Sequence, residues 1–415
     1  MIVALAMYFR AGNAVPEVSD EIFNAGTAAD REKQVERGKY LALAGNCASC
    51  HTAGDRGFMA GGLAFDTPFG TIYSTNITPD TATGIGAWTG REFLDSMRRG
   101  MRPNGEHLYP VFPYTAFTKI NDADIAALYA YFKSIPAVRM ETPDNDITFP
   151  FSQRGLMAVW KAMFFDAGEF QSDDSKSAEW NRGSYLVEAL AHCSACHSPR
   201  NILGAEDADR LMAGGIYTDK VRTGELRPWS VPNLTSAPTG LDLWSHEDVS
   251  AYLKTGQNTY VETFGPMNEV ILNSTRHLSD ADVNAMAVYL KSLPPHADRP
   301  GPQADSGVLG MGRTVYNLHC GTCHLPTGLG DPESAPRLAG GSLVVQASNP
   351  ASMINVILYG PEPPHPPFPT RRRKPMEEFQ YLLTDAEVAA VATYIRSNWG
   401  NSGGQVTEQQ VAEQR

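Results

Sequence analysis

One five-residue pattern occurs three times in this chain and constrains its fold more than any other feature. It reads Cys-x-x-Cys-His and lies at residues 47–51, 193–197 and 320–324. The chain has 415 residues and six cysteines, and all six cysteines lie in these motifs. This spacing is typical of covalent c-type haem attachment, in which two thiols bond to the vinyl groups and the histidine binds the iron. The sequence therefore predicts three covalently bound haems.

The motifs also assign a role to each of their functional residues. The iron ligands are expected to be His51, His197 and His324, and the thioether bonds are expected at Cys47, Cys50, Cys193, Cys196, Cys320 and Cys323. A single Cys-x-x-Cys could instead be a disulfide, a redox thiol pair or half of a zinc site. A zinc site would need a second ligand pair close by in the sequence, and there is none.

Composition limits the partners and the compartment. The net charge of −12 argues against a nucleic-acid partner. No stretch approaches the roughly 20 apolar residues that span a bilayer. Because c-type haem is attached outside the bacterial cytoplasm, we expect a periplasmic protein at the outer face of the inner membrane. Residues 1–29 form an N-terminal segment that we expect to be the remnant of an export or anchor segment, the alternative being a buried or frayed segment.

An internal repeat predicts three similar helical units. Each unit ends in a helix that begins with a capping residue and acidic side chains, at Asn121, Ser279 and Thr384, and that carries an apolar stripe. Asn76-Ile77-Thr78 in the first unit is matched by Asn233-Leu234-Thr235 in the second. The fold class predicted from this repeat is all-α, with three tandem class I cytochrome c-like domains.

The expected domain boundaries follow from the repeat and from proline-rich stretches. Domains are predicted at 30–140, 176–296 and 306–400, with a linker or insertion at 141–175, a linker at 297–305 and a tail at 401–415. We expect the first domain to open with a helix over 31–43 that is capped by Asp30. The apolar stretch 151–171 is expected either to pack between domains or to form a docking face.

The sixth ligand of each haem is predicted from position. In a class I domain this ligand is usually a methionine just before the closing helix, where it raises the reduction potential. Met267 and Met376 occupy this position in the second and third domains. In the first domain, Phe112 stands where a methionine is wanted, and phenylalanine does not bind iron. Three alternatives are open there: Met101 as a sulfur ligand, His107 as a second histidine, or a five-coordinate site.

Nearly the whole chain resembles the three-haem cytochrome c subunit of bacterial periplasmic membrane-bound dehydrogenases of the alcohol, gluconate, fructose, sorbitol and aldehyde type. The matching residues are Gly105-x-His107-Leu108-Tyr109-Pro110-x-x-Pro113-Tyr114, Gly265-Pro266-Met267 with Ser274-Thr275 and Leu278-Ser279-Asp280, and Tyr394-Ile395-Arg396-Ser397-x-Trp399-Gly400. The family pattern has methionine where this chain has Phe112. A phenylalanine there is similar to cytochrome subunits paired with molybdenum hydroxylases of the nicotinate and isoquinoline type.

The resemblance implies a non-catalytic electron-transfer subunit. Its partner would be a catalytic dehydrogenase subunit that contains flavin, PQQ or a molybdenum cofactor. Its electrons would pass to ubiquinone or a terminal oxidase at the membrane surface. Two other functions are open, namely a free-standing multihaem enzyme that uses an open first haem and an independent electron shuttle.

The cationic run 371–374 beside Met376 is expected to be a solvated face or a docking site for acidic partners or lipids.

Overall fold

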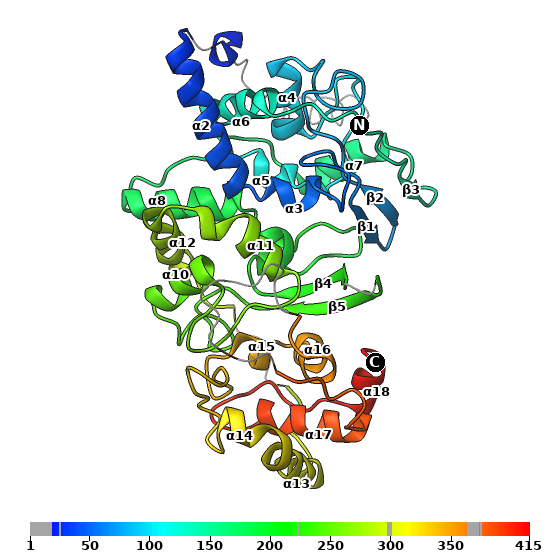
Figure 1. Ribbon diagram of the computed structural model, residues 1–415, viewed down its shortest axis with the longest axis vertical. Coiled ribbons are helices and arrows are strands. Elements are labelled where there is room, and N and C mark those ends of the chain that lie inside the picture. Colours follow the sequence, from blue (N-terminus) through cyan, green and yellow to red (C-terminus); the bar gives the residue numbers. More distant parts are fainter. Residues whose placement is uncertain (1–18, 25, 222–223, 297–300, 363–372, 374–375) are drawn as a thin grey trace, which may run out of the picture. The chain divides into compact units, whose positions relative to one another are not determined.

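The computed structural model describes residues 19–24, 26–221, 224–296, 301–362, 373 and 376–415. These residues form two compact units, Met1–His192 and Cys193–Arg415. Figure 1 shows that helices predominate in both units.

The first unit contains the 3₁₀ helix η1 and a π-helix, η2, among its helices and short strands. Its elements are η1 (Asp20–Phe23), α2 (Ala28–Ala44), α3 (Cys47–His51), β1 (Ala64–Thr67), β2 (Gly70–Tyr73), α4 (Gly90–Arg99), α5 (Tyr114–Phe117), α6 (Asp122–Ser134), β3 (Asp146–Ile147), α7 (Leu156–Phe164), α8 (Ala178–Tyr185) and η2 (Leu186–Leu190).

The second unit contains the second and third haem motifs. Its elements are α9 (Ser194–His197), η3 (Ala208–Arg210), β4 (Gly215–Lys220), β5 (Leu226–Val231), α10 (His246–Thr255), α11 (Met267–Asn273), η4 (Thr275–His277), α12 (Asp280–Ser292), α13 (Ser306–Val315), the π-helix η5 (Tyr316–Cys320), α14 (Gly321–His324), α15 (Leu343–Gln346), α16 (Ala351–Tyr359), α17 (Asp385–Arg396) and α18 (Glu408–Ala412).

The described chain is mostly helical, but the expectation of an all-α fold holds only roughly. Strands β1, β2 and β3 form a small antiparallel sheet in the first unit, with Ala64 opposite Tyr73 and Thr71 opposite Asp146. Strands β4 and β5 form an antiparallel hairpin in the second unit. Strands β1 and β2 follow the first Cys-x-x-Cys-His motif along the chain, and β4 and β5 follow the second.

The closing helices confirm the prediction from capping signals. In α6, α12 and α17, the side chains of Asn121, Ser279 and Thr384 each accept a hydrogen bond from the backbone N–H three residues later. The expected cap of the first helix was wrong. Thr27 has extended backbone angles and its hydroxyl accepts from the N–H of Asp30, which already lies within the first turn of α2.

Small residues allow the first and last helices of a repeat to cross closely. Helix α2 packs on α6 in the first unit, and α13 packs on α17 in the second (Figure 1). A side chain at Gly38 would overlap the carbonyl oxygen of Ala127 in α6. A side chain at Gly312 would overlap the carbonyl oxygen of Ala390 and lie 2.7 Å from Cβ of Tyr394. The glycine found before each of these two motifs in the sequence is therefore a helix-crossing point.

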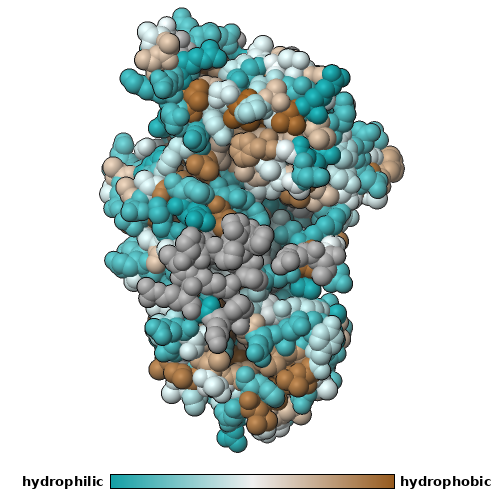
Figure 2. Space-filling view, viewed as in Figure 1, coloured by the Kyte–Doolittle hydropathy of each residue, from teal (hydrophilic) through white to brown (hydrophobic). Residues whose placement is uncertain are grey.

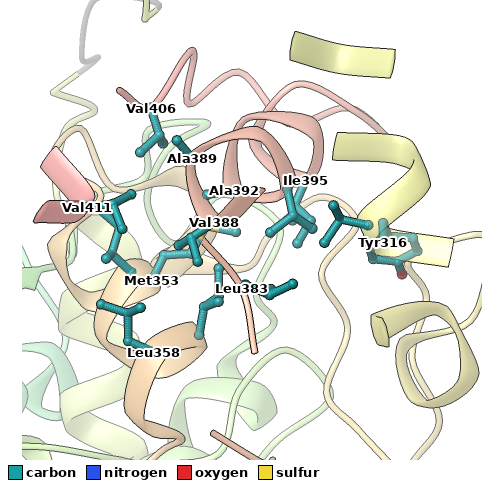
Figure 3. Close-up of a cluster of buried hydrophobic side chains, with 14 of the residues drawn as sticks. Tyr316, Met353, Leu358, Leu383, Val388, Ala389, Ala392, Ile395, Val406 and Val411 are labelled. Carbon is teal, nitrogen blue, oxygen red and sulfur yellow. The ribbon is translucent and has the colours of Figure 1, made fainter. Parts of the chain in front are cut away.

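The third repeat has its own apolar core beside this crossing. Figure 3 shows the side chains of α16 and α17, including Met353, Leu358, Val388 and Ile395, meeting Tyr316 and the C-terminal residues Val406 and Val411. All of these side chains are buried. Burial of this apolar surface supplies the main favourable free energy of folding in this part of the chain.

The apolar stretch at 151–171 packs within the first unit through helix α7. Trp160 and Phe165 meet the ring of Tyr114 edge-on, with centroids 6.4 and 5.1 Å away. Leu156 and Met163, which lie beside Trp160 on α7, are exposed. The helix therefore packs on the first repeat while leaving some of its apolar side chains in solvent.

Residues that precede the second motif are bound to the first repeat. The hydroxyl of Tyr185 in α8 donates to the buried carboxylate of Asp124 in α6 at 2.7 Å. The same carboxylate is paired with Arg37 of α2. Lys119 forms an ion pair with Glu188 of η2. Polar residues in and before the closing helix of the first repeat are therefore paired with side chains that follow the linker in the sequence.

The surface carries few large apolar areas on the face seen in Figure 2, where hydrophilic residues predominate and hydrophobic ones are scattered in small groups. Within the described residues, no helix has the length and apolar character needed to cross a bilayer.

We predict opposite effects for two Gly→Ala substitutions in α13. Gly312→Ala should lower the free energy of unfolding by about 1–3 kcal/mol, because the new methyl group overlaps the backbone of α17. Gly310→Ala meets no atom within 4 Å and should raise it by about 0.5–1 kcal/mol, because alanine favours a helix interior. Denaturant unfolding of the haem-loaded protein measures both. Equal effects of the two substitutions would contradict the close crossing.

Candidate functional site

Each Cys-x-x-Cys-His motif lies on a short helical turn. The three turns are α3, α9 and α14. A separation of three residues on a helix places both cysteines of a motif on one side, with the histidine in the next position. In the first two motifs the preceding residue has a left-handed backbone, with φ of 52° at Asn46 and 40° at His192. This turn redirects the chain into the motif.

None of the six motif cysteines takes part in a disulfide. Burial raises the pKa of Cys47 and Cys193 to about 12 and that of Cys320 to about 11. Among the described residues, no group of three or more His, Cys, Asp or Glu side chains could hold a metal ion.

All three motif histidines are oriented by a backbone carbonyl. Nδ1 of His51 lies 2.6 Å from the carbonyl oxygen of Thr75. Nδ1 of His197 lies 2.8 Å from that of Pro232, and Nδ1 of His324 lies 3.0 Å from that of Pro336. With its proton on Nδ1, each imidazole donates to the carbonyl and keeps the lone pair of Nε2 for a metal.

Burial favours the neutral form of these imidazoles. It lowers the pKa of His51 and of His324, and it lowers that of His197 to about 4, while the carbonyl hydrogen bond opposes the shift in each case. A neutral imidazole with Nε2 unprotonated is the form that binds iron. Orientation and protonation state therefore both fit a proximal haem ligand at each motif.

The repeated Asn-x-Thr sequence fixes two of these carbonyls. Thr75 and Pro232 directly precede Asn76 and Asn233. In both repeats the asparagine Oδ1 accepts from the backbone N–H and the hydroxyl of the threonine two residues later.

The amide nitrogen of each asparagine reaches the chain that leaves the closing helix. That of Asn76 donates to the carbonyl of Val138 at 2.7 Å, and that of Asn233 donates to the carbonyl of His296 at 2.8 Å. The sequence revealed this repeat but not its role, which is to hold the carbonyl that orients the motif histidine.

The loops that should supply the sixth ligand close with the same kind of backbone hydrogen bond in the first two repeats. After the left-handed glycine that ends α4, the N–H of Leu108 donates to the carbonyl of Gly100 at 2.8 Å. After α10, the N–H of Thr263 donates to the carbonyl of Gly256 at 2.7 Å. The residues four positions further on are Phe112 and Met267. Phe112 therefore occupies the place of Met267, and its ring packs on Phe117 with centroids 5.4 Å apart.

Met101 occupies a different place in this loop. It follows Gly100 and forms an isolated bridge with His107, as Gln257 does with Glu262 in the second repeat. Its sulfur lies 3.7 Å from Nζ of Lys161 in α7. For Met101 to bind iron, its thioether would have to leave this contact.

Lys161 is itself buried beside this turn. Its Nζ donates to the carbonyls of Arg99 and Gly100 at 2.6 and 2.8 Å and lies 4.7 Å from the centre of the Tyr114 ring. It thus caps the carboxyl end of α4, where a cation is favoured. Burial, followed by the charge of Lys161, lowers the pKa of His107, whose Nδ1 has no hydrogen-bond partner among the described residues.

Met267 and Met376, the two other predicted ligands, both precede a closing helix. Met267 begins helix α11, directly after Pro266 and Gly265, which has a φ of 56°. Met376 is half-buried and packs against the core of the third repeat. The rest of the cationic run beside it, residues 371, 372 and 374, lies outside the described residues, but Arg373 is described and is half-buried.

Sequence reasoning missed His192, which directly precedes Cys193. Its ring meets Phe117 edge-on with centroids 5.4 Å apart. A hydrogen bond with the backbone of Gly45 raises the pKa of His192, although burial lowers it by more. Gly45 lies two residues before Cys47, so the chain leading to the second motif rests in the first unit against the turn before the first motif. The sequence signal that could have drawn attention to His192 is that a histidine directly precedes the first cysteine in two motifs, at Cys193 and at Cys320.

Three features found together here are typical of proteins that bind c-type haem: helical repeats, pairs of cysteines on one helical turn, and histidines hydrogen-bonded through Nδ1. The chain belongs to the cytochrome c family, whose model matches residues 35–136, 181–294 and 311–399.

Several curated relatives resemble most of the chain. It is 43% identical over 375 residues to a subunit of nicotinate dehydrogenase from Pseudomonas putida, a match that covers 87% of this chain and 30% of that protein. It is 35% identical over 426 residues to the fructose dehydrogenase cytochrome subunit of Gluconobacter japonicus, covering 94% of this chain and 84% of that one. It is 36% identical over 401 residues to the cytochrome c subunit of alcohol dehydrogenase (quinone) of Gluconobacter oxydans, covering 92% and 82%.

We expect Met267→Leu to remove one sulfur–iron charge-transfer contribution from the red end of the ferric absorption spectrum. If Met267 and Met376 are the sulfur ligands, about half of that band should be lost, and the potential of one haem should fall. Met286→Leu is the matched control, because Met286 is a buried core residue of α12. An unchanged band in Met267→Leu would show that this residue is not a ligand.

Met101→Leu tests the first haem. If Met101 is the ligand, one haem should become high-spin and its potential should fall, because thioether ligation stabilises the reduced iron. If Met101 binds iron, its sulfur does not contact Lys161, so Lys161→Met should leave the spin state of every haem unchanged. Electron paramagnetic resonance with redox titration gives both readings. Should every haem keep its spin state and potential in Met101→Leu, the assignment must be dropped.

Proposed function

We propose that this chain is the electron-transfer subunit of a periplasmic dehydrogenase complex and carries three covalent c-type haems. The observation that supports this most is the common geometry of His51, His197 and His324, each held through Nδ1 by a carbonyl so that Nε2 is free for iron. When bound, c-type haem supplies a one-electron couple whose potential depends on its axial ligands and surroundings.

The residues of the chain hold and tune the haems in this proposal. The six motif cysteines would anchor the macrocycles, and the three motif histidines would bind the irons on one side. Met267 and Met376 would complete the second and third sites on the other side. The protein fixes ligands, burial and separation, while the redox chemistry belongs to the cofactor. The chain itself would not oxidise the organic substrate.

The electron donor in this proposal is a separate catalytic subunit. Similarity to the cytochrome subunits of fructose and alcohol (quinone) dehydrogenases supports such a partner. Its cofactor would be flavin, PQQ or a molybdenum centre. The match to a nicotinate dehydrogenase subunit, together with Phe112, favours the molybdenum type. Electrons would leave to ubiquinone or a terminal oxidase, with the chain at the outer face of the inner membrane.

One observation favours a second candidate function. Phe112 lies at the ligand position of the first repeat, and the sulfur of Met101 is in contact with Lys161. A first haem without a sixth protein ligand could bind a small molecule, as a free-standing multihaem enzyme would require. That function needs a high-spin ferric signal and turnover without any partner. The proposed subunit has neither requirement.

Purification from the native host under mild detergent tests the proposal. The chain should elute with a larger subunit that contains flavin, PQQ or molybdenum, identified by mass spectrometry and cofactor analysis. The pyridine haemochrome assay should give three haems per chain. An unrelated periplasmic protein with the same tag, purified in parallel, controls for adventitious capture. Elution of the chain alone, with turnover of a small substrate, would favour the free-standing enzyme.

A further inference from the structure

Arg373 is a half-buried cation whose charge the described residues do not neutralise by hydrogen bonding. Its Nε donates to the carbonyl of Pro332 at 3.2 Å, and its Nη2 donates to the carbonyl of Asn258 at 3.3 Å. Both acceptors are neutral backbone groups. The third nitrogen, Nη1, is buried and has no hydrogen-bond partner among the described residues.

Such an arrangement is costly unless another group completes it. A buried donor without an acceptor has lost its hydrogen bond to water and gained none in return, and a buried cation loses still more. Burial lowers the pKa of Arg373, but a guanidinium still stays protonated in a protein. Its planar set of donors matches the geometry of a carboxylate or a phosphate. The geometry of this side chain therefore calls for an anion at Nη1.

The carboxylates of the surrounding chain do not fill this role. Glu262 and Asp331 both raise the pKa of Arg373 through their charge, so they face it. The Oδ1 atom of Asp331, however, accepts from the backbone N–H groups of Glu333 and Ser334 at 2.9 and 3.1 Å. Neither carboxylate provides a hydrogen-bond acceptor for Nη1.

Arg373 lies beside the third haem motif. One loop carries both of the carbonyls that matter: that of Pro332 accepts from Arg373, and that of Pro336, four residues later, orients His324. The charge of Arg373 also contributes, after burial, to lowering the pKa of His324. A haem bound at this motif would bring its own anions, the two propionate carboxylates, and one of them could supply the missing acceptor.

We propose that Nη1 of Arg373 donates to a propionate carboxylate of the haem bound at His324. This inference rests on the proposed function, because it requires haem at the third motif. Asn258 lies in the loop between α10 and α11 of the second repeat, so the same guanidinium joins that loop to the third haem. A cation held next to the macrocycle disfavours the extra positive charge of ferric iron. Arg373 therefore raises the reduction potential of this haem.

The test measures the midpoint potentials of the complete three-haem protein together with its resonance Raman spectrum. Arg373→Gln should shift one reduction equilibrium about tenfold toward the ferric form, which is about 59 mV for a one-electron couple. The propionate bending mode of one haem should also shift. Arg373→Lys should keep most of the potential, because it keeps the charge. The affected wave should be the one that moves in Met376→Leu.

Arg313→Gln is the matched control, because it removes a cation from the exposed surface of α13 in the same repeat. Because solvent screens this exposed charge, the midpoint potentials of the Arg313→Gln variant should equal those of the wild type. If Arg373→Gln behaves like Arg313→Gln, or if it changes a potential without changing the propionate mode, the contact is absent. Haem content and association with the partner subunit should stay the same in every variant. Loss of either in wild type would count against the proposed function instead.

Discussion

The hydrogen bond from histidine Nδ1 to a backbone carbonyl is the interaction on which each candidate haem site depends. A histidine ring has two nitrogens, and only the one without a proton can bind iron. Fixing the proton on Nδ1 requires an acceptor in the ring plane at the correct distance. His51, His197 and His324 all have such an acceptor, and in each case it is a main-chain oxygen. A main-chain acceptor has no titratable group of its own, so pH does not switch it off.

The surrounding fold keeps that acceptor in place. In the first two repeats, Asn76 and Asn233 tie the carbonyl-bearing segment to the chain that leaves the closing helix. The closing helix is held in turn by its crossing with the first helix, which in the first repeat depends on Gly38. A residue far from the motif can therefore affect the orientation of the haem histidine through a short series of hydrogen bonds and helix contacts.

Local sequence signals predicted the motifs, the closing helices and the place of Phe112, because each depends on neighbours within a few residues. Asn121 and Ser279 mark helix starts by their own side chains, and Phe112 stands between Pro110 and Pro113 in the loop before α6. The partners of His51 and His324 were not predictable, because a carbonyl oxygen is the same in every residue. The contact between Lys161 and Met101 joins positions 60 residues apart and depends on tertiary packing.

The side chains that bind Asp124 affect where the chain can be cut into stable fragments. A family-based boundary would cut the chain in the linker after α6, yet Tyr185 and Glu188 lie beyond that cut and hold Asp124 and Lys119. A fragment ending at residue 140 would expose a buried carboxylate that had lost its hydroxyl partner, whereas one ending at His192 would keep both contacts. Fragments and domain-swap chimeras should therefore be joined after His192, where the first compact unit ends, rather than in the linker.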